Sequence, residues 1–155
     1  MTLEGGAMYR KIVETYNFKP VTEEQFEQLT IPLKKMGVII MRGDDKTEQR
    51  LKIFGAQGST LGSDIVSFRK NVSISTVLEE TYHIIQNRQG MNDDKEQRLR
   101  TILNEIDAKR YLLNIADTYN IPRSEIQETK KHLDYYEKAL VDYYKEEGGD
   151  NDKNN

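Results

Sequence analysis

The stretch SISTVLEETYHIIQNRQG, residues 73–90, is the clearest helical segment of the sequence, and the other elements are best placed relative to it. It predicts a helix from about residue 74 to residue 89 that ends at Gly90, a residue type typical of helix ends. At 100° per residue, one side is apolar and consists of Ile74, Val77, Leu78, Tyr82, Ile84 and Ile85. The opposite side is polar and consists of Glu79, Glu80, His83, Gln86 and Asn87. We expect that polar side to face either solvent or a groove.

Two more helices are predicted downstream of this segment. The first runs from about Asp94 to Tyr119 and carries two apolar stripes, which indicates a central helix packed on both sides. Glu105 and Asp107 fall at the seams between these stripes, where a carboxylate is partly desolvated and needs a partner. The second is capped by Asn120, has a proline in its first turn and continues to about Glu147.

Upstream, the patterns predict short helices and a small sheet. Thr22 and Gln25 form a capping box, and the helical pattern that follows is interrupted at Pro32. A continuous apolar run at residues 38–41 predicts a buried strand, residues 64–68 a second strand, and residues 57–61 a third. Between them, residues 44–55 predict a helix with Leu51 and Phe54 turned inward. The expected class is α+β: N-terminal helices with a two- or three-stranded sheet, then three long C-terminal helices.

Composition limits the kinds of function that fit. The 155 residues suit one domain, which we place at residues 8–147, with an N-terminal extension at 1–7 and a disordered tail at 148–155. The net charge of −3 argues against a nucleic-acid partner, and the lack of cysteine excludes thiolate metal ligands. No apolar run approaches the roughly 20 residues that span a bilayer. We expect a cytoplasmic protein without a membrane partner.

The polar side of the first long helix carries a motif of candidate catalytic and metal-binding residues. Glu79, Glu80 and His83 project from one face, in the spacing that metallopeptidases of the H-E-x-x-H type use. In that motif two ligands four residues apart bind zinc and the glutamate between them activates water. Here Glu79 stands in the place of the first histidine, so that Glu79 and His83 become candidate ligands and Glu80 the candidate general base.

The order of elements around this motif resembles the zincin-like domains of the ImmA/IrrE type. In that layout an edge strand runs beside the active-site helix and an E-x-E-A segment follows, which residues 105–108, Glu-Ile-Asp-Ala, match with Asp107 in place of the second glutamate. The resemblance covers about residues 36 to 116. It implies a zincin-like fold, Glu105 as third ligand, and a metal-dependent, peptidase-like hydrolase. Carboxylate-rich ligation leaves zinc, another divalent ion or no metal as the alternatives.

A second resemblance covers more of the chain. The segments at residues 19–26 and 37–43, the E-E-x-x-H-x-x-Q motif and residues 119–136 look like the C-terminal domains of phage minor-head proteins of the MuF type. Such domains are often toxin-like, and the resemblance implies a phage or mobile-element origin, with a phage-particle-associated location as the alternative to the cytoplasm. It also adds Gln86, one turn beyond His83, to the candidate site. Asp107, which stands at the second glutamate of the E-x-E-A pattern, is a further candidate.

Two other functions fit the same residues. A toxin-type ribonuclease would use His83 and Glu80 as acid and base, with Arg42, Arg69 or Arg88 stabilising the phosphate. A non-enzymatic interaction module with a degenerate site would instead bind an unknown protein or peptide. The tyrosines of the last helix, at positions 135, 136, 143 and 144, are numerous enough for a homo-oligomer contact. His132, beside the apolar stripe of that helix, is interpreted as a boundary residue.

Overall fold

The computed structural model describes residues 18–153 and the side chains up to residue 148. The elements are α2 (Glu23–Leu29), α3 (Ile31–Lys35), β1 (Ile39–Arg42), α4 (Asp45–Phe54), β2 (Gly58–Leu61), β3 (Ile65–Phe68), α5 (Ile74–Gln89), α6 (Gln97–Ile115) and α7 (Arg123–Lys153). The expected α+β class, with a small sheet and three C-terminal helices, is confirmed. The expected extension at residues 1–7 lies outside the described residues.

Capping side chains and a proline set the ends of the N-terminal helices. Thr22 and Gln25 form the predicted reciprocal capping box at the start of α2. At the end of α2 the Thr30 hydroxyl donates to the Phe26 carbonyl, and Pro32 then stands in the first turn of α3, so the predicted break is confirmed. Asp44 caps α4. Within α4, Leu51 is buried as expected, but Phe54 is 38% exposed, so its predicted inward orientation was wrong.

The three strands form a mixed sheet in the order β1-β3-β2. β3 pairs in parallel with β1, with Ile40 opposite Val66, and antiparallel with β2, with Thr60 opposite the same Val66. The central strand β3 is therefore the buried one. β1 lies at an edge and alternates in burial, with Ile39 58% and Met41 38% exposed, so the expectation of a buried strand there was wrong. An apolar run alone does not distinguish a central from an edge strand.

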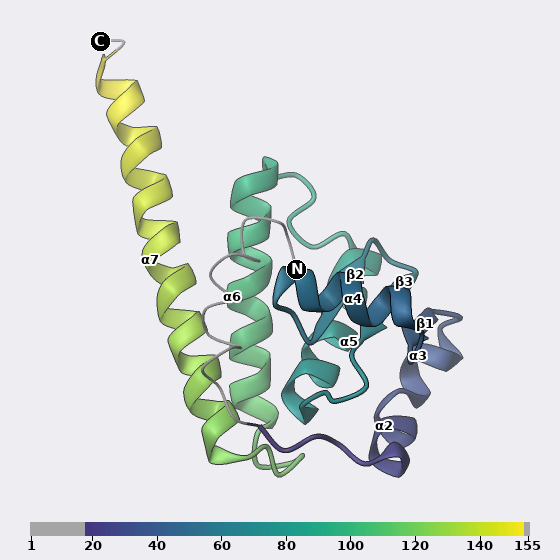
Figure 1. Cartoon of the computed structure of the whole chain (residues 1–155). Helices are drawn as coiled ribbons and strands as arrows, with labels where there is room; N and C mark the ends of the chain where they lie inside the picture. The colour runs from purple at the N-terminus through teal and green to yellow at the C-terminus, as the bar shows by residue number, and fades with distance from the viewer. Residues whose placement is uncertain (1–17, 154–155) are drawn as a thin grey trace.

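The C-terminal half is a layer of helices, with α6 between α5 and α7 (Figure 1). One apolar cluster joins the sheet to α2 and α5, and includes Phe26, Leu33, Val66, Phe68, Val77 and Ile84. A second cluster, with Leu78 and Leu112 at its centre, joins α5 to α6. A third cluster joins α6 to α7 through Ile102, Ile106 and Tyr143. Because α6 contributes to the second cluster on one side and to the third on the other, its predicted central position is confirmed.

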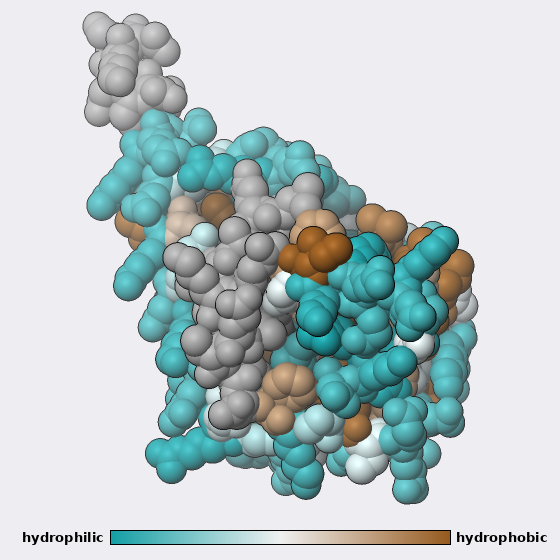
Figure 2. Space-filling view, in the orientation of Figure 1, coloured by the Kyte–Doolittle hydropathy of each residue, from teal (hydrophilic) through white to brown (hydrophobic). Residues whose placement is uncertain are grey.

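Helix α7 is longer than predicted. It continues to Lys153, beyond the expected end at Glu147. Extending an existing helix costs little because each added residue gains a hydrogen bond. Figure 1 shows this end projecting beyond the other helices, and Figure 2 shows a largely hydrophilic surface over α7. Tyr143 packs inward whereas Tyr135 and Tyr144 are exposed, so an oligomer contact there stays a prediction.

A buried carboxylate connects α7 to the start of α5. Glu125 accepts hydrogen bonds through Oε1 from the backbone N–H of Ser75 (3.1 Å) and from the Ser75 hydroxyl (2.7 Å). The N-terminus of a helix has unpaired N–H groups and a partial positive charge, so a carboxylate is stabilised there. Glu125 therefore joins two elements that are 50 residues apart. Among the described residues, none of the helices has the length and apolarity of a bilayer-spanning segment.

The edge strand β2 packs directly on α5 at Gly58. A Cβ added there would lie 2.9 Å from Thr76 Cγ2, 3.1 Å from Glu80 Cγ and 3.2 Å from Phe68 Cδ1. These separations are shorter than ordinary van der Waals contact, so only glycine allows β2 to approach the helix this closely. The position of Gly58 thus sets the distance between the sheet and the helix that carries the motif.

We expect Gly58→Ala to lower the free energy of unfolding by about 1–3 kcal/mol, because the added methyl group overpacks this contact. Urea unfolding followed by circular dichroism measures the change. Gly148→Ala is the matched control, since its added Cβ meets nothing within 4 Å. An unfolding free energy for Gly58→Ala equal to that of the wild type would contradict the close approach.

Candidate metal centre

The polar side of α5 is buried, not solvated. Glu79, Glu80, His83 and Gln86 are exposed by 8%, 4%, 6% and 0%, because α6 and β2 both pack against this part of the helix. Of the two environments expected for this side, solvent or a groove, solvent fits only Asn87, which is exposed, whereas the other four residues face the elements that pack against the helix. A helical wheel separates polar from apolar positions, but it carries no information on what later packs against the polar side.

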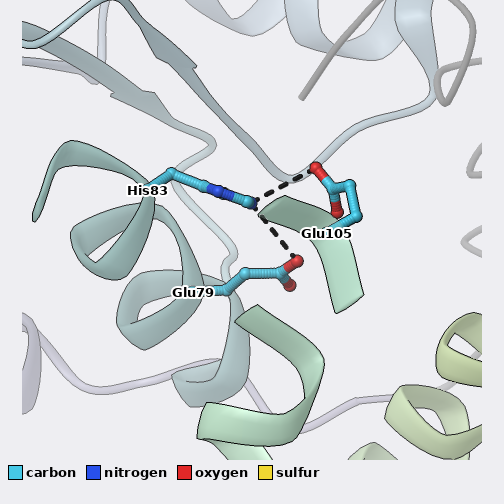
Figure 3. Close-up of side chains that lie close together, drawn as sticks. All are labelled: Glu79, His83 and Glu105. Carbon is cyan, nitrogen blue, oxygen red and sulfur yellow. Dashed lines mark ion pairs between the residues drawn. The ribbon is translucent and has the colours of Figure 1, made fainter. Parts of the chain in front are cut away.

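Three side chains converge in the interface between α5 and α6 (Figure 3). Glu79 and His83 come from α5 and Glu105 from α6, and one ligand atom of each lies within 4.8 Å of the others. His83 Nε2 is 3.3 Å from Glu105 Oε1 and 3.6 Å from Glu79 Oε1. The structure thus brings together the three residues that the sequence indicated as ligands.

Gln86 orients the imidazole ring. Its Nε2 donates to the backbone carbonyl of Asn104 (2.9 Å), which turns Oε1 toward His83 Nδ1 at 2.7 Å. Because an amide oxygen only accepts, Nδ1 must carry the hydrogen of this bond. His83 Nε2 is consequently the ring nitrogen that points at the two carboxylates. Histidine ligands of metals are commonly oriented by such a hydrogen bond from the far nitrogen.

Lys109 belongs to the same cluster and was missed in the sequence. Its Nζ donates to Glu79 Oε1 and to Glu105 Oε2, the latter at 2.5 Å, and the side chain is buried. Because lysines are usually exposed, nothing distinguished Lys109 from the other charged residues of α6. The available signal was its position four residues after Glu105, at a seam where a carboxylate needs a partner. The cluster is therefore Glu79, His83, Glu105 and Lys109.

The charges of the cluster stabilise one another. Burial alone would lower the pKa of His83, but Glu105 and Glu79 raise it to about 10. Burial would raise the pKa of Glu79, whereas the Lys109 ammonium and the hydrogen bond with His83 lower it to about 2. The same two cations hold the pKa of Glu105 well below its usual range, against its burial. At neutral pH, two carboxylates thus face one ammonium and one imidazolium.

Glu80 lies next to this cluster but is held separately. Its Oε2 accepts a hydrogen bond from the Thr60 hydroxyl on β2 at 2.6 Å. Thr60 also lines a pocket of about 160 Å³ beside the cluster, together with His83, Asn87, Gln97, Arg100, Thr101, Asn104 and Glu105. His83 and Glu105 are buried while Asn87 and Gln97 are exposed, so the pocket connects the cluster to the surface. Glu80 therefore contacts the pocket wall through its hydrogen bond with Thr60.

Other candidate residues lie elsewhere. Asp107 lies outside the convergent group. The pKa of Tyr82 is raised by the burial of its own ring and by the charge of Asp107. His132 is half-buried as expected, and burial followed by the Lys109 charge lowers its pKa to about 4. The three arginines considered for a ribonuclease pair with Glu23, Glu48 and Asp64, and none of them lines the pocket. The arginine that does line it is Arg100.

The geometry defines a buried glutamate-histidine-glutamate group, open on one side to a polar pocket and joined by a lysine. The donor set is compatible with a divalent ion, because carboxylate oxygens and an imidazole nitrogen are both ordinary ligands of zinc. The chain matches no model of a known protein family, no curated protein and no solved structure.

The pH dependence of stability tests the charge arrangement. Because the folded-state pKa of His83 is raised from 6.5 to about 10, its contribution is complete below pH 6.5 and is lost as the pH rises through 10. We expect the unfolding free energy of the wild type to exceed that of His83→Gln by on the order of 3–5 kcal/mol near pH 6, less at pH 10.

Urea unfolding of both proteins at several pH values between 6 and 10, in the presence of chelator, measures this difference. His132 does not interfere, because its pKa of about 4 places its titration below this window. A difference that stays constant between pH 6 and 10 would contradict the raised pKa of His83.

Proposed function

We propose that the domain is a zincin-like, metal-dependent hydrolase with a peptide-like substrate, in which Glu79, His83 and Glu105 hold a divalent ion and Glu80 is the general base. The observation that carries the proposal is the convergence of the three ligand atoms. Ligands about 2.0 to 2.1 Å from a tetrahedral zinc lie roughly 3.3 Å from one another. The separations of 3.3 and 3.6 Å from His83 Nε2 fit that spacing without rearrangement of α5 or α6.

Three further features support the proposal. Gln86 leaves His83 Nε2 facing the carboxylates, as a metal ligand requires. The edge strand β2 lies beside the motif helix and borders the pocket through Thr60, in keeping with the resemblance to ImmA/IrrE-type domains. The pocket gives a substrate access to His83 and Glu105. A phage or mobile-element origin is proposed from the resemblance to MuF-type minor-head domains.

Each residue then has a defined part in hydrolysis. A bound divalent ion supplies a more acidic water and polarises a carbonyl. In amide hydrolysis the carbonyl carbon gains a hydroxyl group, the carbon–nitrogen bond breaks, and the nitrogen leaves with a proton. Glu80 accepts the proton of the water and returns it to the nitrogen, which balances the reaction. Thr60 positions Glu80 through its hydroxyl, and Arg100, in the pocket wall, favours a substrate with a polar or anionic group.

Lys109 favours a second candidate, a non-enzymatic interaction module with a degenerate site. Its ammonium already neutralises the two carboxylates that a metal would use. With His83 protonated, the cluster contains two negative and two positive charges and is complete without a metal. In this case the cluster has a structural role between α5 and α6, and function resides on the surface. Metal binding decides between the two candidates.

We expect wild-type protein purified without chelator to bind one equivalent of zinc or another divalent ion, and His83→Ala and Glu105→Gln to lose it, because each variant removes one of the three ligands. Elemental analysis and isothermal titration calorimetry measure the stoichiometry and the affinity. Gln89→Ala, at the exposed end of the same helix and outside the pocket wall, is the matched control. Wild-type protein that neither contains nor binds a divalent ion would favour the interaction module.

Glu80 and Gln86 separate catalysis from binding. Glu80→Gln is expected to keep the metal affinity, whereas its rate of peptide-library hydrolysis should fall at least about 100-fold, since general-base catalysis contributes that much.

Gln86→Leu is expected to weaken metal affinity by about 10- to 100-fold, because the ring of His83 loses its orienting partner. Gln89→Leu, at the exposed end of α5, is the control. Equal affinity of Gln86→Leu and wild type would remove Gln86 from the site.

A further inference from the structure

The position of Lys109 has a consequence for which cation the cluster accepts. Lys109 Nζ donates to Glu79 Oε1, which is also the oxygen that faces His83 Nε2. It donates in addition to the second oxygen of Glu105, whose first oxygen faces His83. The ammonium and a metal ion would therefore compete for Glu79 Oε1, whereas Glu105 has one oxygen for each.

The competition is strong because the whole group is buried. Lys109 is exposed by 2%, Glu105 by 5% and Glu79 by 8%, so water screens their interactions poorly. An ammonium without a counter-ion at such a place is costly. The Tyr136 ring of α7, whose centroid lies 5.5 Å from Nζ, offers a partial alternative partner. Glu105 and this ring therefore both remain beside the ammonium if the contact with Glu79 is lost.

We propose that Lys109 is the residue that sets the cation occupancy of this centre: its ammonium pairs with Glu79 when no metal is bound, and a divalent ion binds only by displacing it from that carboxylate. This inference rests on the proposed metal site and adds its regulation. It gives Lys109 a positioning role, because the ammonium acts on the ligands and not on a substrate. A neutral side chain at position 109 should therefore increase the metal affinity.

The test compares metal affinity in variants of the full chain. Lys109→Met keeps the length of the side chain and removes its charge, and Lys109→Gln is a second neutral variant that can still donate a hydrogen bond if the methionine variant folds poorly. Lys109→Arg keeps the charge. Arg110→Met is the matched control, since it removes one positive charge from the next position of α6, where the side chain is 60% exposed.

Calorimetric titration with zinc, and with manganese as a second probe, gives the dissociation constants. We expect the neutral variants to bind about tenfold more tightly or better than the wild type, and Lys109→Arg and Arg110→Met to show no such gain. The melting temperature should give a second readout. Without metal the neutral variants should melt below the wild type, because two carboxylates lose their counter-ion, and zinc should raise their melting temperature more than that of the wild type.

The outcomes separate this inference from the proposed function. Tight binding by the neutral variants and none by the wild type would support the role of Lys109 and contradict a metal-dependent wild-type enzyme. Binding by the wild type that the neutral variants do not improve would overturn the role of Lys109 and leave the metal centre in place. If neither the wild type nor a folded neutral variant binds a divalent ion, both proposals are wrong.

Discussion

The buried charges of Glu79 and Glu105 constrain the whole helical layer, because two carboxylates between α5 and α6 must be neutralised where they lie. Removing a carboxylate from water costs several kcal/mol, and the cost is offset only when the counter-charges have good geometry. Lys109 and His83 supply these charges. Since a helix turn advances about 5.4 Å, sliding α6 along α5 by one turn would separate the two pairs that cross between the helices, His83 with Glu105 and Lys109 with Glu79. The cluster therefore fixes the relative position of the two helices.

The neighbouring elements are adapted to this arrangement. Gly58 lets β2 approach α5 closely enough for Thr60 to reach Glu80. Further along the interface, the rings of Tyr82 and Tyr111 stack with centroids 4.3 Å apart and add an apolar contact between α5 and α6. The ring of His83 is fixed by Gln86, which is itself held by the α6 backbone. The same contacts that stabilise the fold thus leave His83 Nε2 in one orientation.

Local patterns predicted most of the fold, and long-range packing accounts for the differences. Capping residues and glycine stops placed α5 at residues 74–89 and the break at Pro32, because these signals depend only on neighbours in the sequence. The edge position of β1 and the length of α7 depend on what surrounds them and were missed. For the site, helical spacing indicated Glu79 and His83, whereas Glu105 and Gln86 were added through the two family resemblances. Lys109 was overlooked, because a single lysine carries no sign of its burial.

The bond between Glu125 and Ser75 has a consequence for biosynthesis. A chain is synthesised from its N-terminus, so α5 and α6 emerge before α7 exists. During that interval the first turn of α5 has no buried carboxylate to accept its N–H group, and Lys109 has no Tyr136 ring beside it. Helix α7, which is translated later, thus completes the environment of residues translated before it. A nascent chain that stalls before residue 125 contains every residue of the cluster, but it lacks the helix that packs against α6.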